Sequence, residues 1–454
     1  MAPSDIHKQR VTVIGGARSG LAVAKLLAGQ GAQVFLTERG PAHEGLADEL
    51  DAAGVAYEFG GHTAKALDAD FFVVSPGVPS TAKLVQQATK SGLGVYSEIE
   101  AASWFCEAPI IAITGSNGKT TTTSLIGHIC QTAGRTTYVA GNIGYPFAGY
   151  VERIEPASLV VLEVSSFQLD HIDTFRPRVS VLLNITPDHL DRYDYNFNNY
   201  AQSKFRIFEN QVPGDVLVYN HDDELVRTFA QKAAAKRGFT ALGFSITTAL
   251  DEGGFVEDDH LVLRINNREE RLMHVDQLAL RGKHNLFNSL AAAIATRTME
   301  IGSNPIRESL ASFEGVPHRL ETVRDVEGVR YVNDSKATNV NAVWYAMESF
   351  REKLVLIAGG RDKGNDYSSL RPLARQKCRA VVAIGESADT VYHQLGIAAE
   401  NRVKADSMES ALQFARFFAE PGDVVLLSPA CSSFDMFDNY EHRGNEFKRG
   451  VWSL

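Results

Sequence analysis

Apolar runs typical of buried strands alternate with helix-like stretches along nearly the whole chain. Residues 10–16 (RVTVIGG) precede 21–30 (LAVAKLLAGQ), and residues 109–115 (PIIAITG) precede 120–134 (TTTTSLIGHICQTAG). Continuous apolar strands that alternate with helices are typical of parallel sheets covered by helices. The pattern therefore predicts an α/β protein.

Runs that resemble the first strand of a nucleotide-binding fold begin three times, near residues 11, 109 and 329. A chain of 454 residues agrees with three domains of about 150 residues each. We expect a Rossmann-like domain, a central P-loop-type ATPase domain and a second Rossmann-like domain, each with a largely parallel sheet. The expected bounds are 1–98, 99–303 and 304–454, the last boundary lying in a turn at Gly302–Ile306.

The composition of the chain argues against several classes of protein function. The chain is 44% hydrophobic and 22% charged, as an ordinary globular protein is. A formal net charge of −10 argues against binding nucleic acid through the overall field. The four cysteines are far apart, which argues against a zinc module or a disulfide scaffold. The sequence has no signal-peptide core and no apolar run long enough for a membrane span, so we expect a cytoplasmic protein.

The first glycine turn resembles a dinucleotide fingerprint with one change. In the register Gly15, Ala17, Gly20, the middle glycine is an alanine. That glycine normally lets the backbone approach a pyrophosphate, so its absence weakens an NAD site. Glu38 ends the next strand and could contact a ribose or base, and a second turn at 75–80 (SPGVPS) is expected at the same sheet edge.

The segment ITGSNGKTTTT contains most of a Walker A loop, although Ile113 stands where the first glycine is usual. A strand leads into a turn at Gly115 and Gly118, Lys119 can place a cation on phosphate oxygens, and Thr120 can reach magnesium. The helix that follows directs its N-terminal amides at an anion. These features favour a nucleotide triphosphate site over a simple turn before a helix.

Two further strands end in groups suited to metal or acid–base chemistry. Glu163 interrupts an apolar strand, and burying a carboxylate is costly unless it meets a cation or a hydrogen-bonding partner. Magnesium beside a nucleotide is one such cation, and a satisfied core carboxylate is the alternative. Asp188, His189 and Asp191 follow another strand, where His189 is either catalytic or an ordinary loop histidine.

Eight segments together resemble the Mur ligase family, and the match covers nearly the whole chain in order, from Gly15 to Phe447. They are TGSNGKTTT, GNIG, LEVSSFQL, NITPDHLDR, HNLFNSLAA, PHRLE, NDSKATN and LSPACSSFDMFDNYEHRGNEF. The Gly-Lys-Thr loop is shared with folylpolyglutamate synthases. NDSKATN and the SPACSSFDMF segment resemble the branch of the family that adds D-glutamate.

The resemblance implies an ATP-dependent acid–amino-acid ligase of peptidoglycan precursor synthesis. The substrates would be ATP, D-glutamate and UDP-N-acetylmuramoyl-L-alanine, whose carboxylate forms an acyl phosphate before the amine attacks. Magnesium is the implied cofactor. We expect a monomer with no nucleic-acid or membrane partner.

The resemblance also implies roles for residues of the central domain. Lys119 would contact the β- and γ-phosphates, Asn142 the phosphates or the acyl group, and Thr120 and Glu163 a first magnesium ion. His189 and a carbamylated Lys204 would hold a second magnesium ion. The implied ATP contacts are Gly115, Asn117, Gly118, Lys119, Thr120, Thr121, Asn285, Asn288, Arg319 and Asp334, with His318 nearby.

Without the resemblance, several of these residues have simpler interpretations. Lys204 reads as a helix-surface lysine. Asn285 and Asn288, spaced i to i+3, either present two amides on one helix face or belong to a capping region.

The resemblance places UDP-sugar at the first domain and D-glutamate at the last. The implied UDP-sugar contacts are Arg18, Ser19, Glu38, Ser75, Pro76 and Gly77. The implied D-glutamate contacts are Lys336, Thr338, Lys363, Ser433 and Tyr440. Tyr440 stands where the family leads us to expect phenylalanine, a change of little effect if the backbone makes the contact.

Other functions remain open at this stage. A folylpolyglutamate synthase-like ligase is disfavoured by the domain that precedes the ATP loop. An NAD(P)-dependent oxidoreductase is disfavoured by Ala17, and it leaves the phosphate-binding residues unexplained. A non-catalytic nucleotide-binding regulator would not need Glu163 and His189 together.

Overall fold

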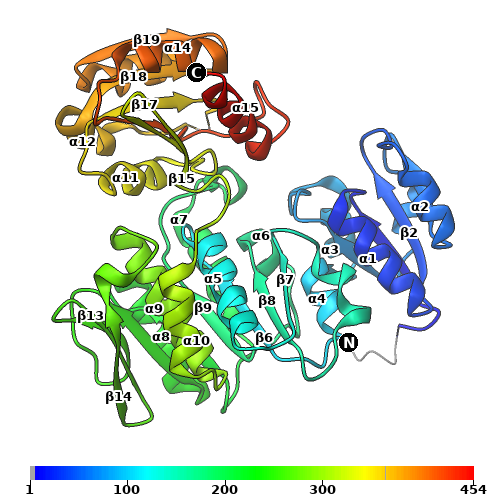
Figure 1. The fold of residues 1–454 in the computed structure, drawn as a ribbon. Helices are drawn as coiled ribbons and strands as arrows, with labels where there is room; N and C mark the ends of the chain where they lie inside the picture. Colours follow the sequence, from blue (N-terminus) through cyan, green and yellow to red (C-terminus); the bar gives the residue numbers. More distant parts are fainter. Residues whose placement is uncertain (1–5, 363) are drawn as a thin grey trace. The chain divides into compact units, whose positions relative to one another are not determined.

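The computed structural model describes residues 6–362 and 364–454. The chain divides into two compact units. The first contains the chain up to Leu278 together with Phe287–Ser312, and the second contains Ala279–Leu286 and Phe313–Leu454. The strands form three sheets, two in the first unit and one in the second (Figure 1).

The first sheet is fully parallel, with strand order β3-β2-β1-β4-β5. The chain starts at its centre, builds one side, and crosses to the other after β3. The turns after β1 and β4 therefore lie at a topological switch point, where open α/β sheets bind ligands. The elements are β1 (Arg10–Ile14), α1 (Arg18–Gly29), β2 (Gln33–Glu38), α2 (Leu46–Ala52), β3 (Ala56–Phe59), β4 (Phe71–Val74), α3 (Lys83–Lys90), β5 (Gly94–Ser97) and α4 (Glu98–Ser103).

The second sheet has the order β14-β13-β12-β11-β10-β9-β6-β8-β7. It is parallel up to β12 and ends in an antiparallel β12-β13-β14 edge. Strand β6, which delivers the Gly-Lys-Thr loop, lies between β8 and β9. The strands are β6 (Ile110–Thr114), β7 (Thr137–Gly141), β8 (Leu159–Glu163), β9 (Val179–Leu182), β10 (Val216–Asn220), β11 (Thr240–Ser245), β12 (Gly253–Glu257), β13 (His260–Ile265) and β14 (Arg268–His274).

The helices of this region follow or cover those strands (Figure 1). They are α5 (Lys119–Thr132), α6 (Ser166–Leu169), α7 (Phe197–Phe205), α8 (Glu224–Arg237), α9 (Lys283–Thr298) and α10 (Ser303–Ser312). The expectation of a turn at Gly302–Ile306 is wrong from Ser303 onward, because these residues form the first turn of α10. Pro305 is compatible with that position, since the first turn of a helix needs no amide donor there.

The third sheet has the order β15-β16-β20-β17-β18-β19 and is parallel apart from the β15-β16 pair. The loops after β16, β20 and β17 leave neighbouring strands at one edge. The elements are β15 (Glu321–Val326), β16 (Val329–Asn333), α11 (Val340–Glu348), β17 (Leu354–Gly359), α12 (Arg371–Lys377), β18 (Cys378–Ile384), α13 (Ala388–Gln394), β19 (Asn401–Ala405), α14 (Met408–Phe418), β20 (Val424–Leu427) and α15 (Tyr440–Trp452).

The central strands are buried along their whole length, as in β6, β8 and β17. Burial on both faces explains why they read as continuous apolar runs in the sequence. The predicted α/β class with largely parallel sheets is confirmed. Within the described ranges, no helix has the length and apolar character that a membrane crossing requires.

Candidate functional site

The glycine turn after β1 brings helix α1 against the strand. Gly15 has a positive φ of 98°, and the Ser75 hydroxyl donates to its carbonyl at 3.1 Å. A Cβ on Gly20 would lie 1.8 Å from the same carbonyl oxygen, a distance that no side chain can occupy. Gly15 and Gly20 are therefore required by packing, and the Ser75 turn lies beside them as the sequence predicts.

The Glu38 carboxylate braces this turn. It accepts hydrogen bonds from the amides of Gly16 at 2.7 Å and Gly40 at 2.9 Å. Its two oxygens keep further lone pairs for a ligand. Of the other predicted contacts at this edge, Arg18 and Gly77 are exposed, and Ser19 and Pro76 are half-buried.

The lysine side chain of the Gly-Lys-Thr loop folds back onto the backbone of the loop. Lys119 Nζ donates to the carbonyls of Gly115 at 2.8 Å and Ser116 at 2.9 Å. The Asn184 side chain fixes the loop from β9: it accepts from the Asn117 amide at 2.9 Å and donates to the Asn117 carbonyl at 3.0 Å. These hydrogen bonds hold the loop in shape.

Helix α5 begins directly after Gly118, whose φ is +85°. Thr120 and Thr121, in its first turn, are each 4% exposed. Asn288 from α9 packs on the loop, because a Cβ on Gly118 would lie 2.5 Å from its Oδ1, which also accepts from Thr122 Oγ1 at 3.2 Å. The predicted loop-to-helix geometry is present, and Asn288 lies against it.

Lys204 is a buried residue, so the expectation of a helix-surface lysine is wrong. Its side chain is 2% exposed, and Nζ donates to the Gly115 carbonyl at 3.0 Å and lies 4.7 Å from the centre of the Tyr200 ring. Lys119 and Lys204 therefore converge on one carbonyl oxygen. Burial, and next the nearby Lys119 charge, hold the pKa of Lys204 well below its usual value.

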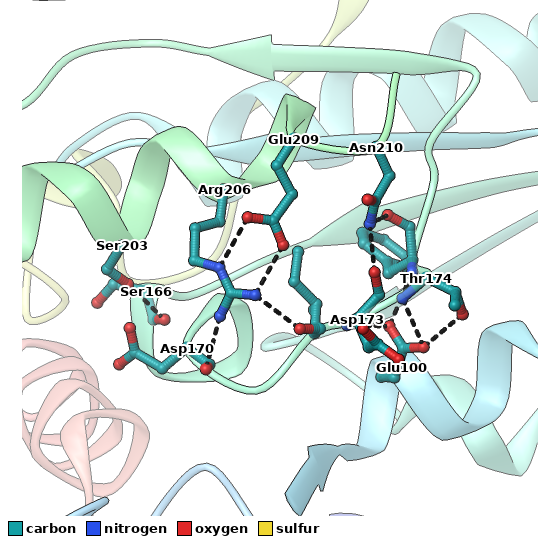
Figure 2. A network of polar contacts seen from close by, with 11 residues as sticks. Glu100, Ser166, Asp170, Asp173, Thr174, Ser203, Arg206, Glu209 and Asn210 are labelled. Atoms are coloured by element: carbon teal, nitrogen blue, oxygen red, sulfur yellow. Dashed lines mark hydrogen bonds and ion pairs between the residues drawn. The ribbon is translucent and has the colours of Figure 1, made fainter. Parts of the chain in front are cut away.

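A polar network holds helix α7, which carries the buried lysine (Figure 2). Ser203 Oγ donates to the Ser166 carbonyl at 2.8 Å. The Arg206 guanidinium donates to the Asp170 carbonyl at 2.6 Å and pairs with Glu209 at 2.7 Å. These bonds join α7 to the segment that follows α6, so the position of the lysine depends on both.

Glu163 and Asn142 form a pair at the ends of β8 and β7. Asn142 Nδ2 donates to Glu163 Oε1 at 2.8 Å, and the Asn142 amide donates to the Glu163 carbonyl at 2.8 Å. Glu163 is 1% exposed, and its Oε2 has no hydrogen-bond partner among the residues that the structure describes. An unpaired buried carboxylate oxygen fits a cation ligand, because leaving it unsatisfied costs free energy.

His189 lies in the loop after β9 with a positive φ of 50°. Its Nε2 is 3.6 Å from Asp188 Oδ2, and its ring meets the Phe167 ring edge to face, with centroids 5.2 Å apart. In the described part of the chain, no three His, Cys, Asp or Glu side chains gather in a metal-binding cluster. A magnesium ion at Glu163 would thus need the Thr120 hydroxyl, ligand phosphates and water to complete its shell.

In the second unit, the residues predicted near ATP surround a buried carboxyl group. Asp334 is 1% exposed and accepts from Ser428 Oγ at 2.8 Å and the Leu320 amide at 3.3 Å. Burial raises the pKa of Asp334 to about 6, while the Arg319 charge opposes that rise. Arg319 Nε is buried and has no partner within the described ranges, which leaves a donor available for an anion.

His318 and Asn285 are fixed by neighbouring groups of the same unit. His318 has a φ of +64°, and Asn333 Nδ2 lies 3.0 Å from its Nδ1. Gly444 leaves space for that ring, since a Cβ there would lie 2.1 Å from Nδ1. Asn285 Nδ2 donates to the Arg281 carbonyl at 2.8 Å, near the start of α9.

The predicted D-glutamate residues come from adjacent loops of the third sheet. Lys336 Nζ lies 5.1 Å from the centre of the Tyr440 ring, and Ser335 Oγ donates to the Tyr440 carbonyl at 2.8 Å. Ser433 is buried and Thr338 is half-buried. Lys363 lies outside the described residues.

Two residues of these sites have structural roles that the sequence did not indicate. Asn184 fixes the phosphate loop, and its only signal in the sequence is a polar residue two positions after a buried strand. Arg443 is 1% exposed and donates to the carbonyls of Ser335 at 2.8 Å and Cys431 at 3.1 Å. The pattern of apolar positions in its helix does not distinguish Arg443 from an arginine that lies in solvent.

Comparisons with known proteins agree with this geometry. Three family models match the chain: the MurD N-terminal domain at residues 10–84, the Mur ligase middle domain at 113–296 and the Mur ligase, glutamate ligase domain at 318–431. The UDP-N-acetylmuramoylalanine–D-glutamate ligase of Salinibacter ruber is 61% identical, and that of Chloroherpeton thalassium is 46% identical, each over 100% of both chains.

Solved structures show the same fold at lower identity. The UDP-N-acetylmuramate-alanine ligase MurC from Thermotoga maritima is 18% identical, with a TM-score of 0.61, over 98% of this chain and 99% of that one. Family models and full-length relatives together establish that the chain belongs to the Mur ligase family.

Proposed function

We propose that this chain is an ATP-dependent amide ligase that adds D-glutamate to UDP-N-acetylmuramoyl-L-alanine in peptidoglycan precursor synthesis. The name of the relative with 61% identity over the full length supports this substrate set. The observation that carries the proposal is the convergence of Lys119 and Lys204 on the Gly115 carbonyl, 2.8 and 3.0 Å away, at the start of α5.

A charged Lys204 beside Lys119 is unfavourable because like charges repel each other, so Lys119 is the cation that this pair supplies to an anion. The backbone amides at the start of α5 add partial positive charge at the same place. In the proposed complex, Lys119 leaves its loop carbonyls and contacts the β- and γ-phosphates. Gly115, Asn117, Gly118, Thr120 and Thr121 line the phosphates, and Asn142 contacts the phosphates or the acyl group.

In the first step, a carboxylate oxygen of the UDP-sugar substrate attacks the γ-phosphorus. The bond from that phosphorus to the bridging oxygen breaks, ADP leaves, and an acyl phosphate forms. Both reactants are anions, so the site must gather them with fixed positive charge. Arg319, whose planar fork suits a phosphate, is proposed as a phosphate clamp.

Glu163 and Thr120 would hold one magnesium ion, and His189 and Lys204 would hold a second. Magnesium, when bound, neutralises the phosphate and carboxylate oxygens. In the carbamylation of Lys204, the neutral amine would attack carbon dioxide, form an N–C bond and lose one proton, which would give an anionic oxygen ligand beside Lys119.

In the second step, the amine of D-glutamate attacks the acyl carbon and phosphate leaves, which forms the amide. Lys336, Thr338, Lys363, Ser433 and Tyr440 are proposed to bind the two carboxylates of D-glutamate. If Tyr440 contacts D-glutamate through its backbone, the difference between tyrosine and phenylalanine in the ring matters little.

The other ligand contacts belong to the turns of the first sheet and to the remaining ATP residues. Arg18, Ser19, Glu38, Ser75, Pro76 and Gly77 are proposed to bind UDP. Asn285, Asn288 and Asp334 are proposed to bind the adenosine of ATP. Residues 1–98, 99–303 and 304–454 would then be the UDP-sugar, ATP and amino-acid domains of a cytoplasmic monomer.

Phosphate release by the purified protein tests the proposal. The assay contains ATP, magnesium and UDP-N-acetylmuramoyl-L-alanine, and compares D-glutamate, L-glutamate, L-lysine and a folate-type acceptor. Release with D-glutamate alone is expected. Release only with a folate substrate would favour the folylpolyglutamate alternative, and oxidation of NADH or NADPH without phosphate release would favour an oxidoreductase.

A further inference from the structure

Glu98 is a buried carboxyl group that the proposed chemistry does not use. It is the first residue of α4, directly after the first sheet, and is 1% exposed. Its Oε1 accepts from the Ala148 amide at 2.6 Å. Its Oε2 is buried and has no hydrogen-bond partner in the part of the chain that the structure describes.

The neighbouring Glu100 shows what a purely structural carboxylate looks like in this helix (Figure 2). Its two oxygens accept from the amides of Asp173 at 2.9 Å, Thr174 at 2.9 Å and Phe175 at 2.8 Å. Glu98 instead makes its bonds to one segment only, and burial raises its pKa to about 7. A carboxyl group that is so poorly satisfied reduces stability, and a role in positioning another segment would explain why it is present.

The segment that Glu98 holds runs from Asn142 to Gly149. At its start, Asn142 bonds to Glu163 through both its side chain and its amide. Gly144 and Tyr145, in the middle of the segment, are exposed, and the Tyr145 carbonyl accepts from the Gly141 amide at 3.2 Å. At its end, the short helix Phe147–Gly149 is attached to the Glu98 carboxyl group.

The same segment meets the helix that begins at the first glycine turn. A Cβ on Gly149 would lie 4.0 Å from the Ala22 Cβ of α1, which is ordinary packing contact. Arg18, the first residue of α1, has its Nη1 3.5 Å from the Gly144 carbonyl. The 142–149 segment thus connects α1, at the proposed UDP turn, with the carboxylate proposed to bind magnesium.

We propose that Glu98 is a positioning residue that holds the 142–149 segment, and through it aligns the Asn142–Glu163 pair with the glycine turn of the first sheet. This inference rests on the proposed function. A displacement of about 1 Å in such a support can reduce turnover by roughly a hundredfold.

Three variants test the inference. Glu98→Ala removes the acceptor for the Ala148 amide, Glu98→Gln keeps an oxygen for it, and Glu107→Ala removes an exposed carboxylate nearby as a matched control. Steady-state kinetics give kcat and a KM for each of the three substrates. Calorimetry with UDP-N-acetylmuramoyl-L-alanine measures binding without turnover.

For Glu98→Ala, we expect kcat to fall by about ten- to a hundredfold and the KM and Kd of the UDP-sugar to rise, with the KM of D-glutamate unchanged. Glu98→Gln should restore kcat to within about threefold of the parent protein. A lower melting temperature with unchanged kcat and KM values in both variants would overturn the inference. If Glu98→Ala does not fold, a Glu98→Gln variant as impaired as Glu163→Gln would also overturn it.

The two proposals fail in different ways. If the parent protein releases no phosphate with D-glutamate, the proposed function fails, whatever the variants do. If the parent protein is active and Glu98→Ala matches Glu107→Ala in kcat and in UDP-sugar binding, only the role of Glu98 is lost.

Discussion

Two glycine turns in this chain begin alike and differ in charge. Each follows a central parallel strand, and each leads into a helix, α1 or α5. The turn at Gly15 is braced by a carboxylate, Glu38, and by the Ser75 hydroxyl. The loop at Gly115 is instead the meeting point of Lys119 and Lys204.

The difference indicates which ligand each turn can hold. A triphosphate that must react with another anion needs positive charge, which Lys119 and the backbone amides at the start of α5 supply at the Gly115 loop. The Gly15 turn offers shape and amide groups, which suit the less highly charged diphosphate of a nucleotide sugar. A shared strand-turn-helix pattern therefore predicts the place of a ligand, and the side chains around it determine the chemistry.

Removal of the loop lysine should have the largest effect. Lys119→Ala removes the main point charge on the γ-phosphoryl group, and we expect phosphate release to fall on the order of 10³-fold. Lys90→Ala, an exposed lysine at the end of α3, is the control. Near-normal turnover of Lys119→Ala in the phosphate release assay would contradict the inference that charge distinguishes the two turns.

The carboxylate at the end of β8 should come next. Glu163→Gln keeps a hydrogen-bond acceptor for Asn142 but removes the charge, so we expect kcat to fall by about 10²-fold and the magnesium requirement to rise. A magnesium titration of phosphate release measures both. An unchanged magnesium dependence would contradict a metal-binding role for Glu163.

At the first turn, the expected effect is smaller and confined to one substrate. In Gly20→Ala the new Cβ would meet the Gly15 carbonyl at 1.8 Å, so strand and helix must move apart, at a cost of about 1–3 kcal/mol or more. We expect UDP-sugar binding to weaken by about tenfold and ATP binding to persist, as measured by calorimetry. Gly302→Ala, where no atom lies within 4 Å of the new Cβ, should change neither.

A buried carboxyl group of the second unit makes the stability of the protein depend on pH. The pKa of Asp334 is raised from 3.8 to about 6, so its protonated form is favoured by folding. The stability from this group is fully present below about pH 4 and is lost as pH rises towards about 6, by on the order of 3 kcal/mol. Above that range, the ionised carboxylate stays buried in the folded protein.

Asp334→Asn should remove this pH dependence. Relative to the parent protein, the variant should gain melting temperature between pH 4.5 and pH 7.5, because it has no charge to bury. Asp325→Asn, on the exposed face of β15, is the matched control. Equal shifts in the two variants would contradict a raised pKa at Asp334.

The fold was largely predictable because local patterns encode it. Buried parallel strands such as β6 and β17 leave continuous apolar runs, and the turns at Gly15 and Gly115 separate them from helices. The start of α10 at Ser303 was not, because Gly302, Asn304 and Pro305 suit a turn and a helix start equally well.

Within the candidate site, the positions of Lys119 and Glu163 were predictable from the sequence. Lys119 follows a glycine turn before a helix, and Glu163 ends an apolar strand. The position of Lys204 was not predictable, because its burial depends on α6 and on the segment joined to it by Arg206, which are distant in sequence. Asn184 and Glu98 act through backbone amides of other segments, and such contacts leave no periodic trace in the chain.

The most direct test of the account follows an oxygen atom. UDP-N-acetylmuramoyl-L-alanine labelled with ¹⁸O in its carboxylate is incubated with the protein, ATP, magnesium and D-glutamate, and the released phosphate is analysed by mass spectrometry. If the carboxylate takes the γ-phosphoryl group at the Gly115 loop, each phosphate formed with the amide carries one ¹⁸O from the substrate. Phosphate without the label, released at the same rate as the amide, would contradict an acyl phosphate and the role given to Lys119.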